Sequence, residues 1–118
     1  MRILIVDDDA GLRQSLALLL RESGYEVAAE GDPEQALARA ASDPFELILC
    51  DVRMPRMSGY ALVDAGIALK PDLKVLLITG FSRDPLPDHL TKRGVEILYK
   101  PFDLEMLPDL ARQTMGAN

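Results

Sequence analysis

Three carboxylates in this chain have the types and positions of a divalent metal site. Asp7 and Asp8 follow the apolar run at 3–6, and Asp51 follows the apolar run at 47–50. Clustered carboxylates repel one another and raise one another's pKa values unless a cation shares them. Oxygen ligands with no His or Cys nearby suit Mg²⁺, which keeps waters and leaves places for phosphoryl oxygens. The three aspartates together therefore predict a bound Mg²⁺.

The ends of the apolar runs also offer groups for phosphoryl transfer. A carboxylate beside a metal can act as a nucleophile and form an acyl phosphate. Asp51 is the best candidate, because it ends the central strand run. Thr79 follows the run at 75–78 and provides a hydroxyl donor. Lys100 follows the run at 97–99 and provides a compact positive charge. Phosphoryl transfer needs mostly such positioning and charge neutralisation.

Strands and helices are expected to alternate along the whole chain. Apolar runs indicate strands near 2–6, 25–29, 46–50, 74–78 and 95–98. Nearly continuous apolar runs are typical of strands in a parallel sheet that is covered on both faces. Ligands of such α/β folds bind outside the carboxyl ends of the strands. We therefore expect an α/β protein whose site residues converge at that edge of the sheet.

Helical patterns fill the intervals between the expected strands. Leucines at helical spacing precede Gly24, which is expected to stop the first helix. The second helix opens with Asp32 as N-cap and Pro33 in its first turn. The third helix is expected to start from Ser58-Gly59 and to end before Pro71. These signals place a helix between successive strands.

Prolines complicate the last two helices. Asp84-Pro85-Leu86-Pro87 forbids a regular helix until about residue 87, so we expect an irregular loop followed by a short helix over roughly 87–93. Asp103 is expected to cap the last helix, whose pattern contains Pro108. An interior proline removes a backbone hydrogen bond. This helix therefore either begins near Leu107 or has a kinked first turn.

Length and composition limit the class of protein. The 118 residues fit one domain, and 48% hydrophobic with 27% charged residues is ordinary for a soluble protein. No apolar run approaches the length that crosses a bilayer, and no signal-peptide pattern opens the chain, so we expect a cytoplasmic location and no membrane partner. The net charge of −6 argues against direct nucleic-acid binding by this domain. The single cysteine, Cys50, is expected to be a small buried hydrophobe, and the single histidine, His89, to be structural or exposed.

In these motifs the chain resembles the receiver domains of bacterial two-component response regulators, of which the chemotaxis receiver is one. The resemblance covers essentially the whole chain, 1–118. It rests on four segments, which are Ile5–Asp9, Asp51–Gly59, Ile78–Gly80 and Tyr99–Phe102. It implies a flavodoxin-like (βα)5 three-layer sandwich, an α/β fold with a parallel five-stranded sheet of order 2-1-3-4-5.

The resemblance also implies roles for the acidic residues. Asp51 would be the phosphoacceptor, which takes a phosphoryl group from a histidine kinase or a histidine phosphotransfer protein in a Mg²⁺-dependent reaction. Asp8, Asp51 and the backbone carbonyl of Arg53 would bind Mg²⁺ directly, and Asp7 would act largely through water. Such a domain phosphorylates itself and loses the phosphoryl group by autodephosphorylation, so it is not a turnover enzyme. Its partner interactions would switch with phosphorylation.

Thr79 and Lys100 would contact the phosphoryl group, and the peptide bond after Lys100 would be cis. In such receivers the Thr hydroxyl moves toward the phosphoryl group, and an aromatic ring three residues before the Lys swings inward. Ile97 occupies that position here, and the nearest aromatic residue is Tyr99. The usual coupling of Thr to an aromatic ring is therefore not expected, and switching would act through the loop at 80–87 or by another route.

Further expectations concern phosphoryl lifetime and partners. Arg53 and Phe81 resemble the positions that flank the path of attacking water. The partner face would comprise 83–93, 95–99 and 103–113. The resemblance also allows a homodimer that forms on phosphorylation. The sequence names neither the kinase nor the downstream protein partner.

Three other classes of protein compete with a working receiver. A phosphatase of the haloacid-dehalogenase type needs a second Asp two residues after the nucleophile, where this chain has Arg53. A flavin carrier conflicts with the acidic turn after the first strand and with 5% aromatic residues and no Trp. A degenerate receiver would act as a phosphorylation-independent protein-interaction module. The complete set of site residues argues against that module, while Ile97 keeps it open.

Overall fold

The sheet consists of five parallel strands in the order β2-β1-β3-β4-β5, as the sequence predicts. The computed structural model describes residues 2–54, 56–80, 86–100 and 102–116. The strands are β1 Arg2–Val6, β2 Glu26–Glu30, β3 Leu47–Asp51, β4 Lys74–Thr79 and β5 Glu96–Tyr99. Strand ends are in register across the sheet: Val6 pairs with Cys50, and Thr79 pairs with Tyr99. The residues that follow these strands therefore meet at one edge.

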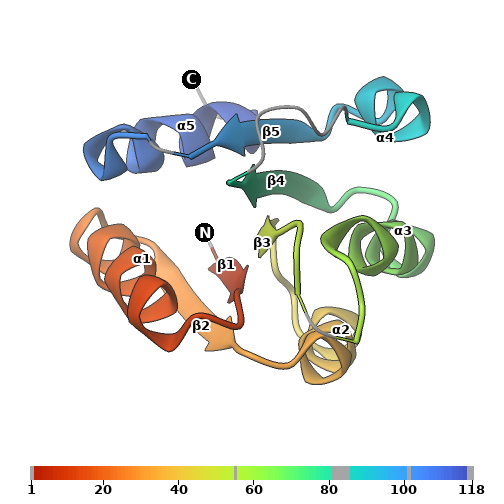
Figure 1. The fold of residues 1–118 in the computed structure, drawn as a ribbon, viewed down its shortest axis with the longest axis horizontal. Helices are drawn as coiled ribbons and strands as arrows, with labels where there is room; N and C mark the ends of the chain where they lie inside the picture. Colours follow the sequence, from red (N-terminus) through yellow and green to blue (C-terminus); the bar gives the residue numbers. More distant parts are fainter. Residues whose placement is uncertain (1, 55, 81–85, 101, 117–118) are drawn as a thin grey trace.

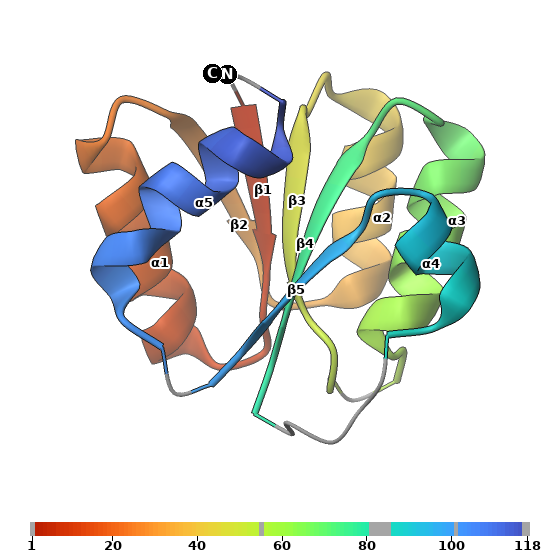
Figure 2. The same ribbon diagram turned by 90° about the horizontal axis from the view of Figure 1, so that it is seen from above.

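Helices cover both faces of this sheet and complete a three-layer sandwich (Figures 1 and 2). Helices α1 and α5 lie on one face, and α2, α3 and α4 lie on the other. The helices are α1 Ala10–Glu22, α2 Pro33–Ser42, α3 Gly59–Leu69, α4 Asp88–Lys92 and α5 Leu107–Thr114, and the 3-10 turn η1 Leu104–Met106 precedes α5. The flavodoxin-like arrangement expected from the motifs is confirmed.

The central strands are buried because they carry apolar side chains toward both helical layers. Residues 3–6 of β1 and 47–50 of β3 are fully or almost fully buried, and so are 75–79 of β4. Side chains from β1, β3 and β4 alternate between two hydrophobic clusters, one under each helical layer. The edge strands β2 and β5 are half-buried or exposed. This rigid centre fixes the strand ends where the polar residues begin.

Side-chain caps begin the first three helices. Asp9 accepts a hydrogen bond from the Leu12 amide, Asp32 from the Glu34 amide and Ser58 from the Ala61 amide. The predicted cap at Asp32 and the predicted start of the third helix at Ser58-Gly59 are confirmed. Gly24 follows α1 with φ of 98°, a conformation that glycine adopts without steric cost.

The proline-rich C-terminal third also matches the predicted pattern. Helix α5 begins at Leu107 with Pro108 in its first turn, where the missing amide is harmless, and η1 precedes it. Asp103 caps η1 through the Glu105 amide instead of capping α5. Helix α4 is short, as predicted, and follows Pro87. The loop expected before it falls largely on 81–85, which lie outside the described residues.

The single cysteine and the single histidine of the sequence have the environments that the sequence predicts. Cys50 is fully buried within β3. His89 is exposed on α4, where its Nε2 lies 2.9 Å from Oδ1 of Asp64 on α3. In the described parts of the chain no helix is long and apolar enough to cross a membrane.

Candidate functional site

Asp7, Asp8 and Asp51 converge at the carboxyl ends of β1 and β3. The two strands are neighbours, so the residues that follow Val6 lie beside Asp51. One carboxylate oxygen from each aspartate lies within 4.8 Å of the other two. Asp7 is buried, Asp51 is half-buried and Asp8 is exposed, so the cluster opens to solvent through Asp8. The predicted convergence of the three carboxylates is therefore present in the structure.

Burial is the main influence on the pKa of Asp7. The pKa of this carboxyl is raised to about 6, mainly by loss of hydration, and the negative charges of Asp51 and Asp8 contribute to the rise. The backbone amide of Asp9, which donates to Oδ1 of Asp7 at 2.9 Å, and the charge of Lys100 oppose this rise. Asp7 therefore holds its proton more strongly than an isolated carboxyl does.

Asp51 has a raised pKa for the same main reason. Burial is the largest cause, and the charge of Asp8 adds to it. The amide of Arg53, which donates to Oδ1 of Asp51 at 3.2 Å, and the charge of Lys100 lower the pKa. Crowded, partly dehydrated carboxylates with only oxygen donors are the ligand set that a hard divalent cation neutralises. The residues present thus fit Mg²⁺.

The backbone around Asp51 is held by the neighbouring elements. The amide of Val52 donates to the carbonyl of Ile78 on β4 at 2.9 Å, and the amide of Gly59 donates to the carbonyl of Val52 at 2.7 Å. A Cβ added to Gly59 would lie 2.4 Å from the Asp51 carbonyl oxygen. Only glycine therefore lets the start of α3 approach Asp51 this closely.

Thr79 and Lys100 reach the same edge from β4 and β5. Thr79 is fully buried at the end of β4. The amide of Lys100 donates to the carbonyl of Thr79 at 2.7 Å, so the two residues lie on adjacent strand ends. The charge of Lys100 lowers the pKa values of both Asp7 and Asp51, which places the ammonium in the field of the acidic cluster. The structure thus brings Thr79 and Lys100 to the same edge as the three aspartates.

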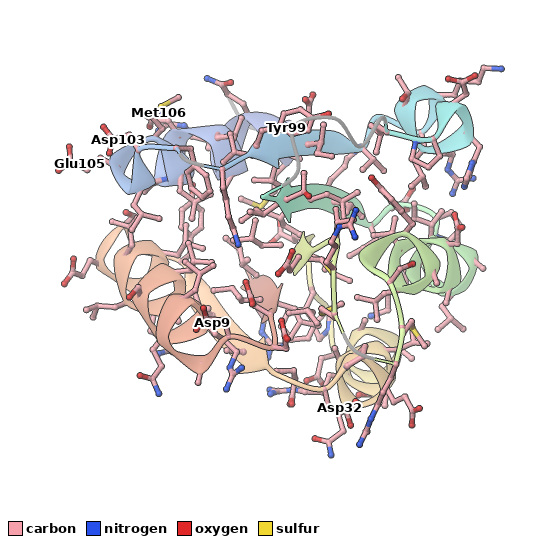
Figure 3. The ribbon with its side chains drawn as sticks, in the orientation of Figure 1. Asp9, Asp32, Tyr99, Asp103, Glu105 and Met106 are labelled. Atoms are coloured by element: carbon pink, nitrogen blue, oxygen red, sulfur yellow. The ribbon has the colours of Figure 1, made fainter. Side chains whose placement is uncertain are left out.

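The position of the expected switching aromatic is aliphatic and packed. Ile97 is half-buried against the cluster under α2, α3 and α4, the cluster that contains Leu90. Tyr99 lies at the end of β5 (Figure 3). Phe81 and the bond from Lys100 to Pro101 lie outside the described residues, so the predictions about the water path and the cis peptide stay predictions.

Two residues near the site were not singled out from the sequence. Arg13 on α1 donates from Nη1 to the Asp7 carbonyl at 2.6 Å. Arg56 has a φ of 74°, and its Nη1 lies 3.7 Å from Oδ1 of Asp32. Figure 3 shows Asp9 and Asp32 at the starts of α1 and α2. Arg56 and Asp32 come from segments that only the fold brings together, and nothing in the residue types around Arg13 indicates that its guanidinium turns back to the Asp7 carbonyl.

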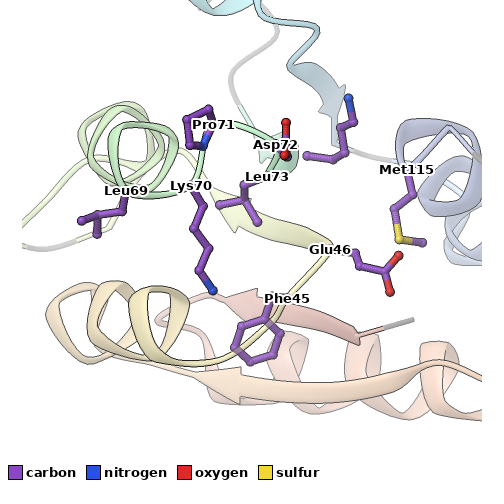
Figure 4. A pocket seen from close by; sticks show the side chains of 9 residues that line it. Phe45, Glu46, Leu69, Lys70, Pro71, Asp72, Leu73 and Met115 are labelled. Carbon is purple, nitrogen blue, oxygen red and sulfur yellow. The ribbon is translucent and has the colours of Figure 1, made fainter.

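A separate hollow lies at the opposite end of the sheet (Figure 4). It measures about 500 Å³ and is bordered by the residues before β3, by the α3–β4 connection and by Met115. Lys70 in this connection donates to the Asp43 carbonyl. Because the acidic residues of the site stand at the carboxyl ends of the strands, this hollow does not belong to the candidate site.

An acidic cluster at the carboxyl edge of a flavodoxin-like sheet, with a threonine and a lysine on neighbouring strand ends, is the arrangement of a signalling receiver domain. Residues 3–112 match the model of the response regulator receiver domain, and the chain belongs to this family. The family consists of the receiver domains of two-component response regulators, which take phosphoryl groups from histidine kinases. Such domains are signalling domains and not classic turnover enzymes.

Similar proteins include both short and long chains. The response regulator receiver protein CpdR of Brucella abortus is 38% identical over 107 residues, which cover 90% of this chain and 89% of CpdR. The transcriptional regulatory protein ZraR of Salmonella typhimurium is 37% identical over 115 residues, 97% of this chain. This chain spans only 26% of the length of ZraR, and about a quarter of several other relatives.

Solved structures agree with this assignment. The receiver domain of the hybrid histidine kinase CckA superposes with a TM-score of 0.82 at 32% identity, covering 98% of this chain and 99% of that one. A CheY-like receiver domain protein from Methanospirillum hungatei gives a TM-score of 0.87 at 29% identity, covering 98% and 93%.

Proposed function

We propose that this chain is a phosphoreceiver in which Asp51 accepts a phosphoryl group from a histidine kinase or a histidine phosphotransfer protein and thereby changes its interactions with a partner protein. One observation carries the proposal. The carboxylate oxygens of Asp7, Asp8 and Asp51 lie within 4.8 Å of one another, at the sheet edge to which Lys100 also belongs. This is the arrangement of a metal-assisted acyl-phosphate site.

The residues present would hold Mg²⁺ with oxygen ligands. Asp8 and Asp51 would bind it directly together with the backbone carbonyl of Arg53, and Asp7 would act through water. When bound, Mg²⁺ supplies positive charge beside the oxygens of the incoming phosphoryl group. The opening of the cluster through the exposed Asp8 gives the ion and the donor access from solvent.

Asp51 is oriented for the attack by its own backbone surroundings. The backbone amides of Arg53 and Val52 donate to this carboxylate, with Arg53 on Oδ1, and one carboxylate oxygen would form the new bond to phosphorus. The phosphorus–nitrogen bond to the donor imidazole breaks as this bond forms, and the imidazole keeps the electron pair. Lys100 pairs with one phosphoryl oxygen, and the Thr79 hydroxyl donates to another. Attack requires the ionised carboxylate, which Lys100 and the Arg53 amide favour.

The aspartyl phosphate would be removed by water. Arg53 is exposed beside Asp51, so its side chain is placed to influence the access of that water. This autodephosphorylation would reset the switch without a separate substrate, which is why we do not propose a turnover enzyme.

A phosphorylation-independent interaction module is less well supported. All the acidic, hydroxyl and basic residues of a working site are present at one edge, and a module that needs no chemistry has no use for buried, mutually repelling carboxylates such as Asp7. Ile97 is the position that departs from the expected pattern. We infer that switching proceeds without an aromatic ring there.

Several wider expectations from the sequence stay predictions. Residues 1–118 as one receiver domain, a cytoplasmic location, a partner face over 83–93, 95–99 and 103–113, and a homodimer formed on phosphorylation are among them. The net charge of −6 favours a protein partner over nucleic acid for this domain. In the longer transcriptional relatives the receiver is one part of the chain.

Intact-mass analysis after incubation with Mg²⁺ and phosphoramidate tests the proposal. We expect one phosphoryl adduct on the native chain and on the control Asp72→Asn, whose exposed side chain lies at the opposite end of the sheet. We expect none on Asp51→Asn or when EDTA replaces Mg²⁺. A folded native chain that gains no adduct would contradict the proposal.

A further inference from the structure

The guanidinium of Arg13 lies against the backbone of the acidic turn. Arg13 is half-buried on α1, and its Nη1 donates to the carbonyl oxygen of Asp7 at 2.6 Å. Its own amide donates to the carbonyl of Asp9 at 2.9 Å. One residue of α1 therefore binds both the first and the last residue of the turn that carries Asp8.

Gly31, which follows β2, makes room for this guanidinium. A Cβ added to Gly31 would lie 2.7 Å from Nη1 and 3.2 Å from Cζ of Arg13. Gly31 is not among the glycines with positive φ, so its backbone alone does not require glycine. A Cβ here would instead push aside the flexible end of the Arg13 side chain, which occupies this space.

The hydrogen bond to Asp7 has a direct geometric consequence. The Asp7 carbonyl belongs to the peptide unit that joins Asp7 to Asp8, and the orientation of this unit sets the directions of both side chains. The Asp7 amide at the other side of the residue donates to the Glu30 carbonyl at 3.2 Å. With both of its backbone groups bound, Asp7 has a fixed orientation at the end of β1.

We propose that Arg13 is a positioning residue for the metal-binding turn, and that its guanidinium, seated against Gly31, holds the peptide between Asp7 and Asp8 so that both carboxylates face Asp51. This inference rests on the Mg²⁺ site of the proposed function. Arg13 binds a carbonyl and none of the carboxylates, so its contribution is geometric. A partner of this kind, one step removed from the ligands, typically changes metal affinity by about 10- to 100-fold.

Calorimetric titration with Mg²⁺ at neutral pH tests the inference on the native chain and four variants. Arg13→Met removes the hydrogen bond, and Gly31→Ala displaces the guanidinium while keeping it in the protein. The third variant combines both substitutions. The matched control is Arg21→Met, because Arg21 on the same helix donates to the Val27 carbonyl at 2.9 Å, away from the site.

We expect about tenfold weaker Mg²⁺ binding for Arg13→Met, a weakening in the same direction for Gly31→Ala, and native affinity for Arg21→Met. The double variant should bind no more weakly than Arg13→Met, because both substitutions break the same contact. Circular dichroism checks that each variant is folded. If Arg13→Met does not fold, the Mg²⁺ affinity of Gly31→Ala tests the role of Arg13.

Native affinity in Arg13→Met or in Gly31→Ala, with the native chain binding Mg²⁺, would overturn the role of Arg13 and leave the proposed function intact. Equal losses in Arg13→Met and Arg21→Met would also overturn it, because the effect would then not be local. A native chain that binds no Mg²⁺ would overturn the proposed function and this inference together.

Discussion

At the scale of single residues, two opposing influences act on Asp7. Burial and the charges of Asp51 and Asp8 favour its protonated form, and the Asp9 amide and Lys100 favour its ionised form. Burial prevails, so the pKa rises to about 6. A bound divalent cation would reverse this balance, because it favours the ionised form. The stability of the metal-free protein should therefore report on this residue.

Because the pKa of Asp7 is raised, the stability of the protein without metal is expected to fall as the pH rises. Its pKa is about 6 in the folded chain against 3.8 for an ordinary Asp, so the folded state binds the proton more strongly. The contribution is fully present below 3.8 and is lost as the pH rises through about 6, up to about 3 kcal/mol in total. Urea unfolding in EDTA between pH 4 and 7 measures it.

Asp7→Asn is the matched variant for this measurement, because it keeps the side-chain shape and removes the titration. The fall in stability over this pH range should be much smaller in Asp7→Asn than in the native chain. The same pH dependence in both proteins would show that Asp7 does not have the raised pKa.

A single methyl group added at Gly59 is expected to lower the free energy of unfolding strongly. A Cβ there would lie 2.4 Å from the Asp51 carbonyl oxygen and 2.8 Å from the Val52 Cα, and these backbone atoms cannot move aside cheaply. Gly59→Ala should lower the free energy of unfolding by about 1–3 kcal/mol, as overpacking does. Gly11→Ala is the control, since its Cβ would lie 3.5 Å from Asp9 Oδ1 in ordinary contact, and alanine favours a helix.

Urea unfolding of both alanine variants gives the comparison. Gly11→Ala should equal or exceed the native stability, while Gly59→Ala should fall below it. Equal stability of Gly59→Ala and the native chain would mean that α3 can move away from Asp51.

At the scale of elements, caps and prolines made most boundaries predictable. Asp32, Ser58 and Pro108 act locally, so their effects on helix starts could be inferred from the sequence. The start of β2 was predicted one residue early, because the Tyr25 amide bonds to the Leu20 carbonyl at the end of α1 and not to the sheet. A contact of this kind depends on the helix that precedes the strand, so the apolar run alone does not reveal it.

Removal of the side-chain oxygen that caps α3 is expected to destabilise the protein measurably. Ser58 Oγ accepts the Ala61 amide at 3.2 Å, at the start of the helix that approaches Asp51. Ser58→Ala should lower the free energy of unfolding by about 1 kcal/mol. Ser15→Ala, an exposed substitution inside α1, should be neutral or slightly stabilising. Thermal unfolding of the two variants checks this, and equal stabilities would contradict the role of the cap.

At the scale of the whole molecule, topology explains how much of the site the sequence predicts. A parallel sheet of this order brings the ends of β1, β3, β4 and β5 to one edge, so Asp7, Asp51 and Thr79 could be assigned to one site before the fold was known. The supports of that site could not be assigned in this way. Arg13 meets Gly31 only because α1 and the end of β2 pack together, and no periodicity encodes that contact.

A metal bound by the native chain should raise the stability of the whole molecule. A ligand that binds only the folded state stabilises it by about 2.7 kcal/mol at one hundred times its dissociation constant. Unfolding at neutral pH should therefore shift to higher urea concentration as Mg²⁺ is added. Asp8→Asn should abolish the shift and Asp72→Asn should retain it. An undiminished shift in Asp8→Asn would place the ion elsewhere.

The chemical identity of the phosphorylated residue is the most direct test of the central claim. Borohydride reduces an aspartyl phosphate to homoserine, and peptide mass spectrometry then locates the reduced residue. After incubation with Mg²⁺ and phosphoramidate, we expect homoserine at position 51 and at no other aspartate. Homoserine at position 7, 8 or 9, or a phosphoryl group that resists reduction, would contradict the assignment of Asp51 as the phosphoacceptor.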